Sequence, residues 1–267
     1  MSDKISPVAV VKEALAVSWA RKGTLVGVMI LGIMPSLLMV GIQLAYPDLA
    51  AVVGIVGFAC VMVVSCFVYV MLNHTAISQM RGEDDFFPKN MVLAMWRVFV
   101  RGLIAYLGMA LPMLIGMLPF ILIILYGAGP GGEISTGLFT AGVIFAFIGW
   151  LAGFGLMLRL AVMIPGAATG RVVKVKEALA MTKGHVWRMV GSLVMTILPM
   201  IVLQILFVTV LGPSGGEAQD GGFPVLPFIL LLAVACIVSL VAFVTLPVWY
   251  EKLRLRQEAM ASAPSAE

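Results

Sequence analysis

Lys176-Glu177-Ala178-Leu179-Ala180, with the apolar run after it, decides the fold, because the same five residues stand 164 positions earlier as Lys12-Glu13-Ala14-Leu15-Ala16. At the same shift Pro35 matches Pro199, and a fainter copy between them places Pro112 at the corresponding position. Each copy reads as an amphipathic segment, a basic or aromatic junction, and an apolar helix with a proline about halfway along. This repetition predicts a fold built from three similar helical units.

The composition is that of a membrane protein. Of the 267 residues, 62% are hydrophobic and 11% are charged, with a mean hydropathy of +1.11, whereas a soluble domain is about 25% charged. Six apolar stretches each reach the roughly 20 residues that cross a bilayer. Backbone groups in lipid must be satisfied within the segment, so we expect helices. The stretches lie at 24–46, 49–72, 98–126, 138–165, 189–211 and 224–250.

We therefore expect an all-α, polytopic membrane protein, with six transmembrane helices arranged as three repeated helical hairpins and with amphipathic interfacial helices. Residues 1–258 would form a single transmembrane domain, and 259–267, rich in Ala, Ser and Pro, a disordered tail. Residues 1–23 contain no small-residue cleavage site after an apolar run, so we expect the first helix to be retained rather than cleaved as a signal peptide.

Positive charge predicts the orientation. The 17 Lys and Arg residues fall in the N-terminal segment, between Arg81 and Arg101, between Arg159 and Arg188, and in the C-terminal end. The opposite loops, around Asp48 and at 127–137 and 212–223, contain none. The positive-inside rule then places both termini in the cytoplasm.

The amphipathic segments allow two interpretations. In the first, Val8, Val11, Leu15 and Trp19 recur at helical spacing. Such a helix can lie in the membrane interface, with Trp19 at headgroup level. It can equally pack against cytosolic neighbours, and the sequence does not separate the two.

Catalytic motifs fail on context. Residues 212–216 match the G-x-S-x-G elbow and 127–132 match G-x-G-x-x-G, but both lie in glycine-rich outer loops without the strands that these motifs require. Glu83-Asp84-Asp85 reads as a solvated loop. We expect no enzymatic activity, no cofactor, no metal site and no nucleic-acid partner.

The three cysteines, Cys60, Cys66 and Cys236, lie inside apolar runs and read as small buried hydrophobes.

A basic segment between the fourth and fifth predicted spans is the candidate binding face. Basic residues near a membrane gain about 1 kcal/mol each from anionic lipid, and a histidine among cations suits a phosphate headgroup better than a metal. We expect Arg159 to extend to the cytoplasmic headgroups. The candidate residues are Arg159, Arg171, Lys174, Lys176, Lys183, His185, Trp187 and Arg188.

The repeated prolines are candidate hinges. Pro35, Pro112 and Pro199 fall at about the same depth and each removes a helix hydrogen bond, so three kinks could surround one space. Proline is also ordinary in membrane helices when neighbours satisfy the freed carbonyl. No Asp, Glu, Lys or His lies at the centre of a span, which disfavours an ion-coupled carrier.

Four short motifs carry a family resemblance: Pro165-Gly-Ala-Ala, Lys176-Glu-Ala-Leu, the run from Thr182 to Gly191, and Trp249-Tyr-Glu-Lys-Leu-Arg254. With them the chain resembles uncharacterised bacterial six-helix membrane proteins related to the membrane domain of glycerophosphodiester phosphodiesterases, and also YciC-like envelope proteins. The resemblance implies a bacterial inner-membrane location. The phosphodiesterase's soluble catalytic barrel has no counterpart here, so no activity is carried over.

Two functions follow as hypotheses. The first is a non-catalytic accessory or scaffold protein whose basic cytoplasmic face engages anionic phospholipid headgroups or a membrane-protein partner. The alternative is a translocator that passes a lipid-like or small amphipathic solute through a proline-kinked helical bundle.

Overall fold

A computed structural model describes residues 5–46, 48, 50–85, 87–126, 135–211 and 225–262. Apart from a single 3₁₀ residue, the regular structure of these residues is α-helical, which confirms the all-α class. The helices are α1 (Pro7–Ala20), α2 (Lys22–Ala45), α3 (Ala50–Arg81), α4 (Met91–Tyr126), α5 (Thr136–Ala161), α6 (Met163–Ala168), α7 (Val175–Met181), α8 (Val186–Leu211) and α9 (Val225–Ser262).

Four helical segments among the described residues are long and apolar enough to cross a membrane: Lys22–Gln43, Gly54–Arg81, Met91–Tyr126 and Thr136–Ala168. A fifth candidate joins α7 to Val186–Val202 across a bend of 79°. The chain therefore has the helices of a multi-pass membrane protein. The side chains of residues 225–237 in α9 lie outside the described residues, so the sixth span and the three-hairpin repeat stay predictions.

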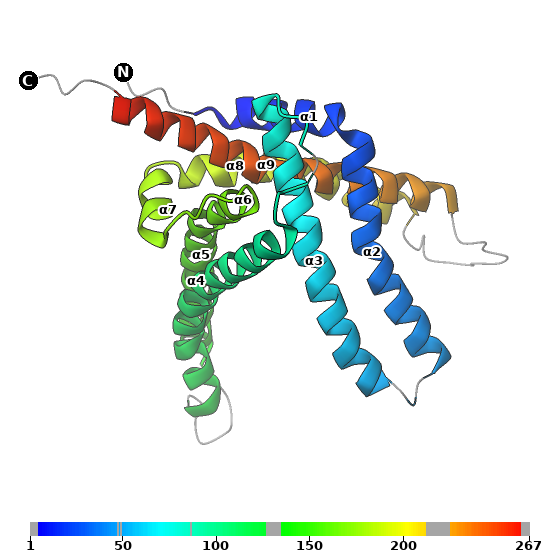
Figure 1. Cartoon of the computed structure of the whole chain (residues 1–267). Coiled ribbons are helices and arrows are strands. Elements are labelled where there is room, and N and C mark those ends of the chain that lie inside the picture. Colours follow the sequence, from blue (N-terminus) through cyan, green and yellow to red (C-terminus); the bar gives the residue numbers. More distant parts are fainter. Residues whose placement is uncertain are drawn as a thin grey trace, which may run out of the picture.

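The long helices pack in consecutive pairs, α2 with α3, α4 with α5, and α8 with α9. Figure 1 shows the α2–α3 and α4–α5 pairs diverging from a common end, where α1, α6, α7 and the C-terminal part of α9 gather. We call this common end the base layer. The second copy of the repeat departs from the other two, because α4 begins at Met91 without a separate short helix before it.

The buried core lies in the base layer. Its largest members include Leu25 of α2, Leu72 of α3, Met163 of α6, and Trp249 and Tyr250 of α9. Away from this end the paired helices expose aliphatic side chains along their length. That distribution suits lipid contact, since lipid tails are as apolar as leucine and give no reason to hide these residues.

The side chains of α1 divide into a buried set and an exposed set. The helix α1 packs on α8 and α9, and its buried residues are Val10, Ala14, Val17 and Ser18. Leu15, which is 51% exposed, and Trp19, one turn further on, point away from this contact. The small residues allow close packing, so the larger ones face outward. The helix α1 therefore packs against neighbours and also presents an apolar side to the surroundings, and its position in the membrane interface stays a prediction.

The aromatic pair Trp249-Tyr250 ends an apolar run, where aromatic residues often lie at the headgroups, but here both side chains are fully buried. The reason is that α9 continues through the base layer to Ser262. Trp249 Nε1 donates a hydrogen bond to Ser192 Oγ at 2.8 Å, which satisfies the indole inside the core.

In the pair α4–α5, Gly149 and Gly153 allow a close helix approach. A β-carbon added to Gly149 would lie 2.6 Å from the Cα of Gly116, and one added to Gly153 would clash with the carbonyl oxygen of Met109. Small residues at helix contacts are typical of membrane proteins because they let backbones meet.

Candidate functional site: the basic face beside α7 and α8

The eight predicted site residues all lie in or beside the base layer. They extend from the end of α5, through the loop and the short helix α7, to the first turn of α8. The 79° bend between α7 and α8 makes this connection a corner rather than a continuous span. The structure divides the eight residues into those with partners inside the protein and those that point outward.

Arg159 has internal partners. Its Nε donates to Thr182 Oγ1 at 3.2 Å and its Nη2 donates to the Leu179 carbonyl at 2.7 Å. Carbonyls in the last turn of a helix lack intrahelical donors, and a guanidinium near them also favours the helix dipole. Arg159 therefore stabilises the end of α7, which corrects the expectation that it extends to lipid headgroups.

Arg171 and Arg188 are also engaged. Arg171 pairs with Glu177 at 3.1 Å and with Glu258 at 3.5 Å. Arg188 Nη1 donates to the carbonyl of Ile5 at 3.3 Å. These contacts attach both ends of the chain to the α7 region, so the two arginines contribute first to the cohesion of the base layer.

Lys174, Lys176 and Lys183 are exposed. Within the part of the chain that the structure describes, none of the three ammonium groups makes a hydrogen bond or ion pair. They flank or belong to a helix of seven residues, so they lie within roughly 15 Å of one another along the chain. Trp187, 80% exposed, follows Lys183 by four residues and lies in the first turn of α8. We call these four residues the lysine face.

His185 does not belong to that outward set, because it is only 5% exposed. Its Nε2 contacts the guanidinium of Arg256, and its ring centroid lies 6.2 Å from that of Trp249. Burial, together with the nearby positive charges of Arg256 and Arg188, lowers the pKa of the imidazole below its ordinary value. A neutral ring inside the base layer replaces the interfacial histidine that we expected.

Sequence reasoning missed a buried ion-pair network. Arg81 donates from Nε to Glu251 Oε1 at 3.1 Å and from Nη2 to Oε2 at 3.0 Å, while Arg254 donates from Nε to the same carboxylate. Burial alone would raise the pKa of Glu251, but the bonds from Arg81 and Arg254 outweigh it and leave that pKa lowered. The only sequence signal was one acid among bases after Trp249-Tyr250.

The candidate hinges lie inside helices, Pro35 in α2, Pro112 in α4 and Pro199 in α8. The helices α2 and α4 belong to two pairs that diverge from the base layer (Figure 1). Their role as hinges stays a prediction.

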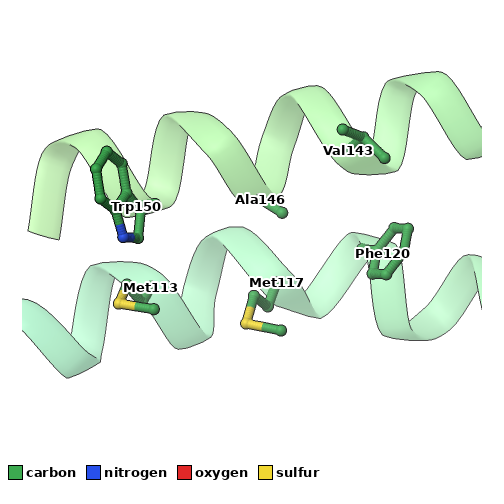
Figure 2. Close-up of a pocket in the computed structure, with 6 residues that line it drawn as sticks. All are labelled: Met113, Met117, Phe120, Val143, Ala146 and Trp150. Atoms are coloured by element: carbon green, nitrogen blue, oxygen red, sulfur yellow. The ribbon is translucent and has the colours of Figure 1, made fainter. Parts of the chain in front are cut away.

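Two apolar grooves lie along the outer surfaces of the helices. Figure 2 shows the first, of about 300 Å³, where Met113, Met117 and Phe120 of α4 face Val143, Ala146 and Trp150 of α5. The second, of about 380 Å³, lies between α5 and α8 and reaches Trp187 of the lysine face. Among the described residues no cluster of His, Cys, Asp or Glu could hold a metal ion.

Comparison with known proteins does not assign the chain to a family. The chain matches no protein-family model, no curated protein and no solved structure. The resemblance to the membrane domain of glycerophosphodiester phosphodiesterases and to YciC-like proteins therefore stays a prediction.

Proposed function

We propose that this chain is a non-catalytic accessory or scaffold protein of the bacterial inner membrane, whose lysine face engages anionic phospholipid headgroups. The observation that carries the proposal is the contrast within one short segment. Arg159, Arg171 and Arg188 are used internally, whereas Lys174, Lys176 and Lys183 are exposed and have no partner among the described residues. Compact ammonium groups beside an exposed tryptophan suit a phosphate-rich surface.

The proposal includes the orientation and the remaining spans. Six helices would cross the membrane as three hairpins, and both termini and the base layer would be cytoplasmic. Support comes from the charge pattern of the sequence and from the many internal ion pairs of the base layer, such as Arg81–Glu251 and Lys252–Glu13. Anionic lipids give the cytoplasmic leaflet a negative surface potential that attracts exposed lysines.

Translocation of a lipid-like solute is the alternative. The observation that favours it is the pair of apolar grooves beside the proline-bearing helices α4 and α8. Translocation requires the prolines to permit movement, whereas lipid engagement requires only the exposed cations. The two functions therefore predict different sensitive residues.

The test is native mass spectrometry of the purified protein with phosphatidylglycerol. Neutralising Lys174, Lys176 and Lys183 together to Gln should lower bound phosphatidylglycerol by at least about tenfold, given about 1 kcal/mol per cation, and 0.5 M salt should weaken the wild type in the same direction. The control is the double variant Lys12→Gln, Lys89→Gln, which removes two other exposed cations. Unchanged lipid in the triple variant contradicts the proposal, and loss of a co-purifying protein instead would favour a membrane-protein partner.

A further inference from the structure

The groove between α5 and α8 continues directly from the lysine face. Its walls include Trp150 and Phe154 of α5 and Val190, Val194, Ile197 and Ile201 of α8, and none of its lining residues is charged. At the base-layer end the lining includes Val186 and Trp187. The exposed Lys183 precedes Trp187 by four residues, in the turn that leads into α8, so a cation lies close in the chain to this end of the groove.

The α8 side of the groove is long enough for one acyl chain. From Val186 to Ile201 the helix rises about 22 Å at 1.5 Å per residue. Half of the hydrocarbon core of a bilayer, which one acyl chain spans, is about 15 Å. An acyl chain that enters beside Trp187 and follows α8 therefore has an apolar wall over its whole length. A headgroup at the opening would meet the lysine face.

The character of the walls separates a lipid chain from a protein helix. The closely packed pair α4–α5 meets through glycines, among them Gly116, Gly149 and Gly153. Small residues of that kind let two helix backbones approach. The α5–α8 groove is instead lined by bulky aromatic and branched side chains, with Gly155 as its single glycine. A thin, flexible acyl chain can fill such a surface, whereas a helix would be held away from it.

We infer that an anionic phospholipid occupies this groove, with an acyl chain between α5 and α8 and its phosphate beside Lys183 and Trp187. The inference rests on the proposed function and adds a defined seat for the lipid. Lipid binding at this site then depends on the groove between two helices as well as on surface charge. A general attraction to the leaflet would need the lysines only.

A matched pair of tryptophan substitutions on α8 tests this seat. Val194 lines the groove and is 53% exposed, while its neighbour Met195 is 46% exposed and is not a lining residue. Both positions face outward, so a larger side chain is tolerated at each. Bound phosphatidylglycerol is counted by native mass spectrometry for Val194→Trp and Met195→Trp, with thermal unfolding to verify that both variants fold. Phosphatidylcholine serves as the uncharged comparison lipid.

The expected result is that Val194→Trp lowers tightly bound phosphatidylglycerol by about threefold or more, because the inserted ring removes the packing contacts of the acyl chain. Met195→Trp should retain the wild-type amount, and Lys183→Gln should lower phosphatidylglycerol without changing phosphatidylcholine. Wild-type lipid in Val194→Trp overturns the groove inference. The proposed function survives that result if the triple lysine variant still loses lipid, and falls with it if the triple variant does not. Loss of a dimer rather than lipid in Val194→Trp would show that a second copy fills the groove, which also overturns the inference.

Discussion

Glu251 is the buried carboxylate that joins α3 to α9 in the base layer. Its carboxylate is buried and accepts a bidentate bond from Arg81, 170 positions earlier, as well as bonds from Arg254 of its own helix. The pair joins α3 to α9. Removing one partner of a buried pair leaves the other charge without compensation, and this costs more than the pair itself contributes.

Glu251→Gln should therefore lower the free energy of unfolding by about 3 kcal/mol, seen as a lower thermal midpoint in detergent. Glu258→Gln is the matched control, because Glu258 also pairs with Arg254 but is half exposed, and exposed pairs contribute at most about 1 kcal/mol. Equal midpoints for the two variants would contradict a structural role for the buried pair.

His185 gives the base layer a pH dependence. Its pKa is lowered in the folded protein by burial and by Arg256 and Arg188, so below the ordinary value of about 6.5 the unfolded chain binds the proton more readily. Stability from this group is complete above that value and falls as the pH decreases below it. The thermal midpoint should decline from pH 7 to pH 5, and His185→Gln should flatten the decline. An unaltered slope in the variant would show that the ring is not held neutral.

At the level of single residues, the sequence was sufficient to locate the cations. It did not show which cations have partners inside the protein and which are exposed. The cluster between Arg159 and Arg188 is plain in the charge pattern, and the structure keeps it at one end of the molecule. Which members are free depends on partners far along the chain, as with Ile5 for Arg188 and Glu258 for Arg171. No local sequence pattern predicts contacts between residues so far apart in the chain.

Among the elements, the α4–α5 pair has the tightest helix contact. Gly153 lies against the backbone of Met109, so an added β-carbon forces the helices apart. Gly149 and Gly153 form a small-xxx-small pair, a local sequence pattern that is typical of such contacts. For α1 the sequence left open whether the apolar stripe is buried, and the reason is physical. Periodicity finds apolar sides, but lipid and protein neighbours are both apolar, so it does not tell which side is buried.

Gly153→Ala and Gly137→Ala in α5 form a matched test. The first should destabilise the protein by about 2 kcal/mol through overpacking. The second has open space around it and should be neutral or stabilising by up to about 1 kcal/mol, because alanine favours a helix over glycine. The thermal midpoints of the two variants in detergent measure the difference. Indifference to Gly153→Ala would mean that the two helices do not approach closely.

For the whole molecule, hydropathy predicted a multi-pass helical protein, and the described helices bear that out. The divergence of the α2–α3 and α4–α5 pairs from a shared base layer (Figure 1) was not predictable. Sequence identifies which segments are apolar enough for lipid, whereas the angle between pairs depends on packing in a small core drawn from distant segments, such as Leu25, Leu72 and Trp249.

Substitution of the prolines distinguishes lipid binding from lipid translocation. If the protein engages lipid without moving it, Pro35→Ala and Pro199→Ala should leave bound phosphatidylglycerol within about twofold of wild type, since neither proline bears a charge that a headgroup could recognise. Lipid movement in reconstituted vesicles should be equally slow with and without the substitutions. Movement that needs the prolines, with lipid binding indifferent to the lysine face, would favour the translocator.

The most direct measurement of the central claim, a cytoplasmic base layer that meets the lipid headgroups, is thiol labelling in intact cells. In a background with Cys60, Cys66 and Cys236 replaced by Ser, one cysteine is placed at Ser135, before α5, or at Ser262, at the end of α9. Ser262 is chosen for the base-layer side because Ser78, at the base-layer end of α3, is buried and a thiol there would be inaccessible to the reagent. We predict that an impermeant thiol reagent labels Ser135→Cys in intact cells and labels Ser262→Cys only after the membrane is opened. Labelling of Ser262→Cys in intact cells would place the lysine face outside and contradict the account.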